Sequence, residues 1–283
     1  MRVLHLLVAD GEIADGRRRV VATAGATFAE SYANVLRDIA AAVVDTFTPA
    51  DENATPPRDL GAYDGIAVTG SSLNIHKREP ASLRQIEFVR EVFARGIPMF
   101  GSCWGLQLAA VAAGGDVAPN RAGREIGFAR HITLTEAGRS HALHAGRPPS
   151  FDAPAIHGDE VTRLPENAIV TAANGMSKIQ AAEIRFGKSV FWGVQYHPEF
   201  SLHDVAAMVR RNRVSLLSEG FFSEQQDLDC YAADIDLLQG DRTRRDIAWR
   251  LGLNSEITED RKRICEIANW ISRQVMPSIF ARC

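Results

Sequence analysis

The chain has 283 residues, of which 46% are hydrophobic and 24% charged, and its formal net charge at pH 7 is −3. This length can bury a full core and provide one domain plus an appendage. Without a basic footprint there is no electrostatic argument for nucleic-acid binding, and no apolar run approaches the roughly 20 residues needed to span a bilayer. We therefore expect neither a nucleic-acid nor a membrane partner.

Apolar strands and helical stretches alternate along the first hundred residues. Apolar runs predict strands near residues 2–9, 43–47, 65–69 and 97–101, and helical spacing predicts helices over Phe28–Ala42 and Ser82–Arg95. The stretch Thr48–Arg58, with its three prolines, predicts a loop. The alternation is typical of a mostly parallel central sheet flanked by helices, which predicts an α/β fold.

The second half of the chain predicts shorter strands and then helices. Segments such as Ala129–Thr135 and Ala168–Thr171 suit strands, and a helix is expected over Leu202–Leu217. We expect one domain over residues 1–218 and a helical C-terminal extension over residues 219–283. Apolar spacing within the extension predicts three helices, marked by Leu228, Ile235 and Leu238, by Ile247, Trp249 and Leu251, and by Ile264, Ile267 and Ile271. We interpret the extension as a cap over the domain, with a partner-docking or dimerisation surface as the alternative.

A cysteine stands between two glycines where a predicted strand meets a predicted helix, in the segment Gly101-Ser102-Cys103-Trp104-Gly105. Nucleophile elbows hold their central residue in a strained turn, and flanking glycines leave room for tight strand-to-helix packing. The N-terminus of the following helix, predicted over Leu106–Ala113, favours ionisation of the thiol. The pattern predicts a nucleophile, with a small buried hydrophobic residue as the alternative.

A second motif supplies the groups that a nucleophilic cysteine needs. The predicted strand Ser189–Tyr196 runs directly into His197-Pro198-Glu199. Residues two apart in an extended chain share a face, so His197 and Glu199 can lie side by side while Pro198 stiffens the backbone between them. A cysteine activated by a histidine, which a third group orients, is the arrangement of nucleophilic catalysis.

With Gly-x-Cys-x-Gly-x-Gln early and His-Pro-Glu late, the chain resembles the class I (triad) glutamine amidotransferases, including the amidotransferase domain of GMP synthetase, over roughly residues 1–215. The resemblance implies a flavodoxin-like fold with Cys103, His197 and Glu199 as the catalytic triad. It also implies an oxyanion hole formed by Gly70, Ser71 and Trp104. The substrate contact that it implies is Gln107.

Some of these assignments have ordinary alternatives. The family often has a second glycine at the position of Ser71, and the Gly70-Ser71 loop read alone is a surface turn. An isolated glutamine such as Gln107 is usually a solvated surface residue, although it lies one helical turn past the cysteine. The His157-Gly158-Asp159 turn also resembles the family pattern, and we interpret His157 as structural or as an indirect support of the site.

The implied activity is hydrolysis of the side-chain amide of glutamine through a glutamyl thioester, with release of ammonia for an unidentified acceptor. It requires no metal or organic cofactor, and the family implies a synthetase or another acceptor enzyme as a partner. One alternative is a γ-glutamyl hydrolase or peptidase that acts on another γ-glutamyl amide. A second is a non-catalytic module that binds γ-glutamyl ligands, and a cysteine peptidase is more distant.

The remaining cysteines and two nearby histidines carry less information. Cys230, Cys265 and Cys283 form no Cys-x-x-Cys pair, and the N-terminus is typical of a first strand rather than of a signal peptide, so we expect a cytoplasmic protein. His141 and His144 lack an acidic or cysteine partner at ligand spacing. We expect them on a solvated face and predict no metal site.

Overall fold

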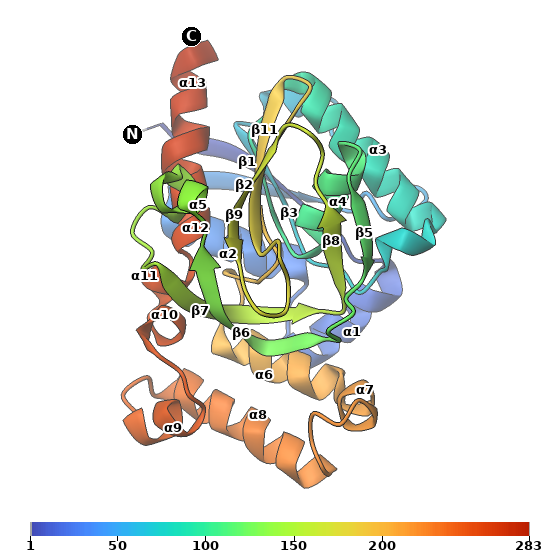
Figure 1. Ribbon diagram of the computed structural model, residues 1–283. Helices are drawn as coiled ribbons and strands as arrows, with labels where there is room; N and C mark the ends of the chain where they lie inside the picture. The colour runs from blue at the N-terminus through green and yellow to red at the C-terminus, as the bar shows by residue number, and fades with distance from the viewer. Residues whose placement is uncertain (1, 283) are drawn as a thin grey trace.

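The computed structural model describes residues 2–282, and its centre is a nine-stranded sheet with helices on both faces (Figure 1). The strands of this sheet are β1 (Leu4–Ala9), β2 (Ala42–Phe47), β3 (Gly65–Val68), β4 (Met99–Ser102), β6 (Glu125–Leu134), β7 (Ser150–His157), β9 (Ala168–Ala173), β10 (Ala181–Phe186) and β11 (Ser189–Val194). A separate two-stranded sheet pairs β5 (Asp116–Pro119) with β8 (Asp159–Arg163).

The strand order in the large sheet is β2-β1-β3-β4-β11-β10-β9-β6-β7. The neighbours from β2 to β11 pair in parallel, and those from β11 to β7 pair antiparallel. The predicted α/β class is therefore confirmed, with a parallel half that contains both β4 and β11. Because these two strands are parallel neighbours, their carboxyl ends meet at one edge, which is where open α/β sheets bind ligands.

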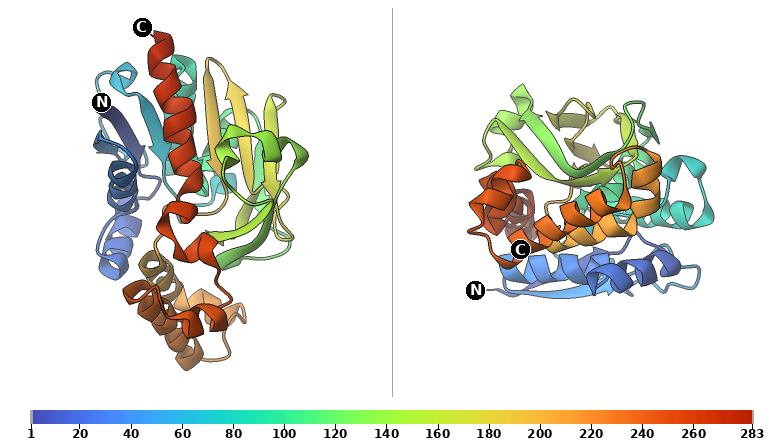
Figure 2. Two further views of the ribbon diagram at one scale, coloured as in Figure 1. Left: turned by 90° about the vertical axis from the view of Figure 1, so that its left-hand side faces the viewer. Right: turned by 90° about the horizontal axis from the view of Figure 1, so that it is seen from below.

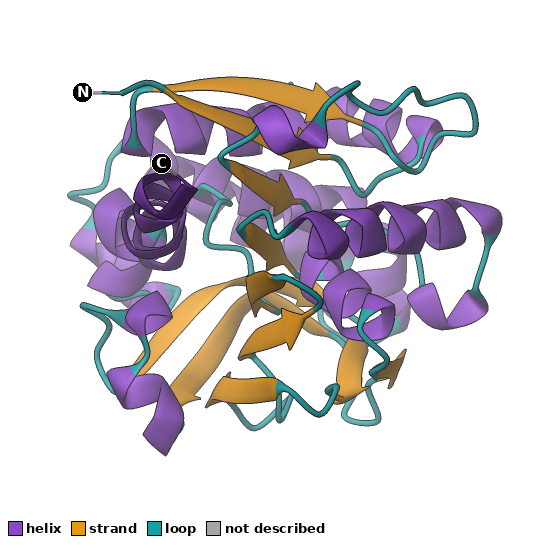
Figure 3. Cartoon of the chain, turned by 90° about the horizontal axis from the view of Figure 1, so that it is seen from above, coloured by secondary structure: helices purple, strands orange, loops and turns teal. Residues whose placement is uncertain are grey.

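Helices cover the two faces of the sheet (Figure 3). In the first 218 residues they are α1 (Ala14–Ala24), α2 (Phe28–Ile39), α3 (Pro80–Arg95), α4 (Trp104–Ala112), α5 (Glu136–Ser140), α6 (Leu202–Arg211) and α7 (Arg213–Ser218), with 3₁₀ turns over Leu60–Ala62, Ile75–Lys77 and Ala142–His144. Helix α2 packs its buried face into one core, and α3 and α4 pack into the core on the opposite face. No helix among residues 2–282 is long and apolar enough to cross a membrane.

The helices differ from the predicted ones most clearly in three places. Helix α1 was not predicted. Helix α2 ends at Ile39, short of the predicted Ala42, because the chain turns extended at Ala40 and Ala42 pairs with Leu4 in the sheet. The helix predicted from the sequence is too long because alanine has a high helix propensity, which the strand pairing overrides. The predicted helix Leu202–Leu217 is interrupted at Asn212, whose side-chain amide donates to the Met208 carbonyl (2.8 Å).

The C-terminal segment first covers α6 and then returns to the sheet. Its helices are α8 (Gln225–Gly240), α9 (Arg245–Arg250), α10 (Ser255–Thr258), α11 (Asp260–Arg263), α12 (Cys265–Trp270), the π-helical turn η4 (Ile271–Val275) and α13 (Met276–Arg282). Helix α8 shares a core with α6, whereas α12 and η4 belong to the same core as α2. Figure 2 shows the last helix lying across the sheet between its first strands and β7. Ile247 is buried as expected, but Trp249 is 85% exposed.

Helix α12 is attached to the sheet by a buried ion pair. The fully buried carboxylate of Glu266 accepts two hydrogen bonds from Arg147 (2.8 and 2.7 Å) and one from the Tyr196 hydroxyl (2.9 Å). His144 lies beside this pair, with its Nε2 2.9 Å from Thr171 Oγ1. The expected solvated face at His144 is therefore wrong, because the returning α12 covers it.

Candidate active site

Cys103 sits in the turn between β4 and α4 with a strained backbone, φ 51° and ψ −100°. Its backbone amide donates to the Val194 carbonyl at the end of β11 (2.7 Å). The flanking glycines are sterically required: a Cβ on Gly101 would lie 2.8 Å from the Gly105 backbone, and a Cβ on Gly105 would lie 2.7 Å from the Val68 carbonyl oxygen. The turn therefore displays the thiol at the carboxyl edge of the sheet, in the geometry of a nucleophile elbow.

His197 and Glu199 follow β11 and lie against the same edge. Nδ1 of His197 is 2.7 Å from Glu199 Oε1, and the imidazole stacks on the Phe200 ring with 4.1 Å between centroids. Within the described residues Nε2 of His197 has no hydrogen-bond partner, although it is buried. Burial alone would lower the pKa of His197, but the Glu199 carboxylate and the Cys103 thiol reverse that effect and raise it to about 10. The imidazole of His197 therefore favours its protonated form.

A hydrogen-bond chain behind the imidazole holds the carboxylate in place. The buried hydroxyl of Ser102 donates to Glu199 Oε2 (2.8 Å), and the Tyr32 hydroxyl lies 3.5 Å from Ser102 Oγ. Burial and the nearby Glu199 carboxylate raise the pKa of Tyr32 well above its ordinary value, so the phenol stays protonated. Both oxygens of Glu199 are thus engaged, which fixes the imidazole that it orients.

The loop after β3 faces the histidine and is held from the opposite side by Glu12. A Cβ on Gly70 would lie 2.7 Å from His197 Cε1, so this close approach requires a glycine. The backbone amide of Ser72 donates to Glu12 Oε2 (2.8 Å), while Oε1 of Glu12 accepts from the Ile13 amide (2.9 Å). Glu12 therefore fixes the loop through Oε2, while its Oε1 is engaged by the neighbouring Ile13 amide.

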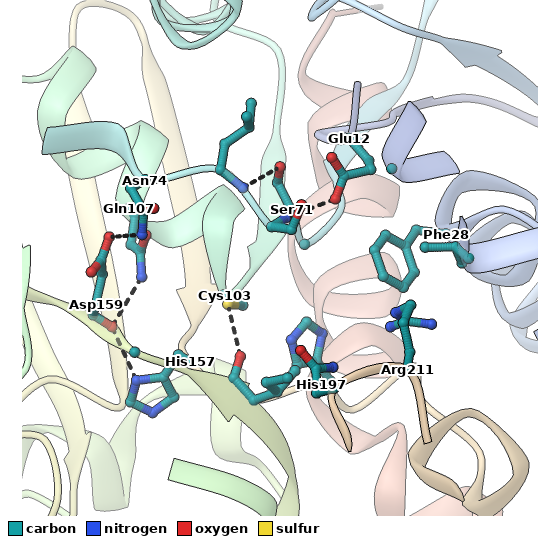
Figure 4. Close-up of a pocket in the computed structure, with 18 of the residues that line it drawn as sticks. Glu12, Phe28, Ser71, Asn74, Cys103, Gln107, His157, Asp159, His197 and Arg211 are labelled. Atoms are coloured by element: carbon teal, nitrogen blue, oxygen red, sulfur yellow. Dashed lines mark hydrogen bonds between the residues drawn. The ribbon is translucent and has the colours of Figure 1, made fainter. Parts of the chain in front are cut away.

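One cavity of about 390 Å³ opens at this edge, and the thiol lies in its middle (Figure 4). Figure 4 shows Gln107, Asn74 and Asp159 on one side of Cys103, and Phe28 and Arg211 on the other side, together with His197. The remaining lining residues are Glu12, Gly16, Arg19, Val20, Gly70, Ser71, Ser72, Leu73, Arg124, Ile156, His157, Gly158, Phe200 and Asn212. The site therefore has two arms that meet at the sulfur.

In the first arm the polar side chains are tied to one another. The Gln107 amide donates to the Asp159 carbonyl (3.2 Å) and to Gln195 Oε1 (3.3 Å), and Asp159 Oδ2 accepts from Asn74 (3.0 Å). His157 lines this arm but pairs with Glu125 (2.8 Å) away from the thiol. Gln107 is accordingly buried at the cavity wall and is not a solvated surface residue.

The structure brings most of the candidate residues to one cavity. Gly70, Ser71, Cys103, Gln107 and His197 line it, and Glu199 lies directly behind the imidazole. Trp104 does not line the cavity, and its buried indole donates to Gln85 Oε1 (2.8 Å). Its backbone amide is nevertheless the first of α4, and such amides lack an acceptor within the helix.

The sequence analysis missed several lining residues, among them Glu12, Phe28 and Arg211. Glu12 had a usable signal, because it follows β1 closely and ligands bind at the carboxyl ends of such strands. Phe28 and Arg211 had none, since they are ordinary helical residues that only the packing of α1, α2 and α6 brings to the cavity.

Comparison with known proteins places the chain in a family. The model of glutamine amidotransferase class-I matches residues 20–215. A glutamine amidotransferase from Thermotoga maritima has the same fold, with a TM-score of 0.65 over 97% of this chain and 99% of its own, at 16% sequence identity. The chain belongs to the class I glutamine amidotransferase family, which confirms the predicted resemblance.

Relatives within this family differ in how much of their length is shared. A γ-glutamyl-L-1-hydroxyisopropylamide hydrolase from a Pseudomonas species is 38% identical over 98% of this chain and 95% of its own length. The GMP synthase of Thermomicrobium roseum is 30% identical over 68% of this chain, but the match spans only 33% of that synthase. The hydrolase is therefore matched along nearly its whole length, whereas most of the synthase has no counterpart in this match.

Proposed function

We propose that the protein is a thiol hydrolase of γ-glutamyl amides, with Cys103 as nucleophile, His197 as general acid and base, and Glu199 as the group that orients the imidazole. The observation that carries this proposal is the strained Cys103 elbow in one cavity with a buried His197–Glu199 pair. A histidine with its Nδ1 side engaged and its Nε2 free is prepared to exchange a proton with the thiol.

In the first half-reaction the Cys103 sulfur attacks the γ-carbonyl carbon, and its proton resides on His197 Nε2. The oxyanion accepts hydrogen bonds from the backbone amide of Trp104 and from the Gly70-Ser71 loop, and such donors are typically worth about 3–4 kcal/mol of barrier each. When the C–N bond breaks, His197 gives its proton to the departing nitrogen, which leaves as a free amine or ammonia.

In the second half-reaction water replaces the amine. His197, now neutral, takes a proton from that water, whose oxygen attacks the thioester carbonyl. The C–S bond breaks and glutamate leaves, which restores the thiolate and the imidazolium. The first arm of the cavity, with Gln107, Asn74 and Asp159, holds the glutamyl part through its hydrogen-bonding groups.

The leaving group separates this proposal from that of an ammonia-supplying amidotransferase. The nearly full-length match to a hydrolase of a substituted γ-glutamyl amide favours an amine that is released to solution. The match to the GMP synthase favours the second candidate, a glutaminase that passes ammonia to a synthetase partner. The second arm of the cavity, beyond the thiol, provides the space that a substituted amine needs.

The test compares substrates with and without a substituent on the amide nitrogen. We expect the purified chain to release glutamate and amine from N-substituted γ-glutamyl amides faster than it releases ammonia from glutamine, and Cys103→Ala to abolish both reactions while its circular dichroism is unchanged. Activity on glutamine alone would favour the amidotransferase candidate. Turnover that survives in Cys103→Ala would overturn the assigned nucleophile.

A further inference from the structure

The second arm of the cavity receives the leaving group, if the proposed function holds. His197 protonates the departing nitrogen, so the substituent on that nitrogen must lie on the His197 side of the sulfur. Figure 4 shows Phe28, Arg211 and Glu12 on this side, opposite the arm that contains Gln107 and Asp159. The chemistry of the second arm therefore selects the amine.

The wall of this arm combines apolar surface with positive charge. Val20, Phe28 and Phe200 line it, and the Phe28 and Phe200 rings stack with 5.7 Å between centroids. The guanidinium of Arg211 lies over the Phe28 ring at 5.5 Å from its centroid, and the exposed Arg19 lines the same arm. A ligand that fits this wall carries an apolar substituent and a group that a guanidinium binds.

The acidic groups nearby are already engaged. Both oxygens of Glu12 accept backbone amides, and Glu219 is bound by Arg124 through two hydrogen bonds (2.9 and 2.8 Å). Within residues 2–282 no carboxylate forms an ion pair with Arg211, whose side chain makes one hydrogen bond, to Thr23 Oγ1 (3.1 Å). A guanidinium has five N–H donors, so most of those on Arg211 remain for a ligand.

The electrostatics of the arm also favour an anion. Burial lowers the pKa of Arg211, and so does the positive charge of Arg19, whereas Glu12 and Asp204 oppose these effects. Arg19 and Arg211 repel each other, and neither forms an ion pair with a carboxylate of residues 2–282, so a bound anion would stabilise both.

We propose that the second arm binds a leaving group with a carboxylate, so that the preferred substrates are γ-glutamyl amino acids, with Arg211 as the residue that determines this specificity and Arg19 as its support. The amine of such a substrate is an α-amino acid, whose side chain contacts Val20 and Phe28. The bonds made and broken are those of the proposed hydrolysis, and the products are glutamate and the free amino acid.

Two matched amides test this specificity. γ-Glutamyl-L-alanine carries a carboxylate where the γ-glutamyl amide of L-alaninol carries a hydroxymethyl group, and the two are otherwise alike. We expect the wild-type kcat/KM to be about 10-fold or more higher for γ-glutamyl-L-alanine than for the alaninol amide. A hydrogen bond to a charged group is stronger than one to a neutral group, and the difference changes an affinity by about that factor.

Arginine substitutions then identify the residue that recognises the carboxylate. Arg211→Met should bring the ratio of the two kcat/KM values close to one, and Arg19→Met, at an exposed position, should lower it less. Arg213→Met is the matched control, since Arg213 is exposed, lies two residues away and does not line the cavity. It should leave the ratio as in the wild type.

The outcomes separate this inference from the proposed function. A wild-type ratio of one or below, or a ratio that neither Arg211→Met nor Arg19→Met lowers, overturns the carboxylate specificity while turnover of both amides upholds the hydrolase. Cleavage of neither amide overturns the proposed function, and the specificity with it.

Discussion

The buried pair between Glu266 and Arg147 should make the C-terminal segment essential for stability. Glu266 is fully buried and accepts both hydrogen bonds of the Arg147 fork, whose side chain is 1% exposed. Burial alone would raise the pKa of Glu266, but Arg147 reverses this and lowers it to about 2, so the carboxylate is charged in the folded protein. Glu266→Gln would leave the buried guanidinium without this countercharge.

The expected cost follows from what remains around Arg147. Removal of one partner of a buried ion pair typically costs about 3–5 kcal/mol. Glu256 still accepts from Arg147 Nη1 (2.8 Å), so we expect the lower end, about 3 kcal/mol of unfolding free energy. The measurement is urea unfolding followed by tryptophan fluorescence, since Trp270 lies on the same helix.

Two controls accompany this substitution. Glu259→Gln removes an exposed partner of Lys262 and should change the unfolding free energy little. The double variant Arg147→Met/Glu266→Leu should recover part of the loss, because the fully buried charges are removed together and only the partly exposed Glu256 loses its partner. A loss below about 1 kcal/mol for Glu266→Gln, or a double variant as unstable as the single one, would refute the reasoning.

The remaining predictions concern pH and the carboxylate of Glu199. Ser102→Ala removes the hydrogen bond to Glu199 and should lower kcat about 10-fold with little change in KM. Ser102→Thr, which keeps the hydroxyl, should retain more activity. An unchanged kcat in Ser102→Ala would contradict the role of Ser102 in positioning Glu199. Glu199 raises the pKa of His197 to about 10, so kcat/KM should fall as the pH rises towards 10. Glu199→Gln should move this fall to lower pH. If the variant and the wild type lose activity over the same alkaline range, the role given to Glu199 is contradicted. The lowered pKa of Glu266 contributes stability above about pH 4.5 that is lost as the pH falls towards 2, so acid unfolding of Glu266→Gln should lack that dependence.

Local patterns in the sequence were enough to predict the parallel half of the sheet and the elements that carry Cys103, His197 and Glu199. The glycines around Cys103 and the period-two placement of His197 and Glu199 are short-range signals, and each motif follows its predicted strand in the structure. Family resemblance linked the two motifs, which lie on neighbouring strands because β4 and β11 pair directly.

Long-range packing explains what the sequence did not predict. The return of α12 to the sheet depends on Glu266, Arg147 and Tyr196, which are far apart in the chain and individually ordinary. The second arm likewise forms only when α1, α2 and α6 converge, which brings Arg211 over Phe28. Hydrophobic periodicity indicates which face of a helix is buried but not the element that it meets.

The most direct test of the central claim is to trap the covalent intermediate. Acid quenching during turnover of a γ-glutamyl amide, followed by mass spectrometry of the peptide that contains Cys103, should find a glutamyl group on that sulfur. The adduct should be absent from Cys103→Ser quenched in the same way, and hydroxylamine should remove it from the wild type, as expected of a thioester. Turnover of the amide without any adduct on Cys103, or with an adduct on another residue, would contradict the account.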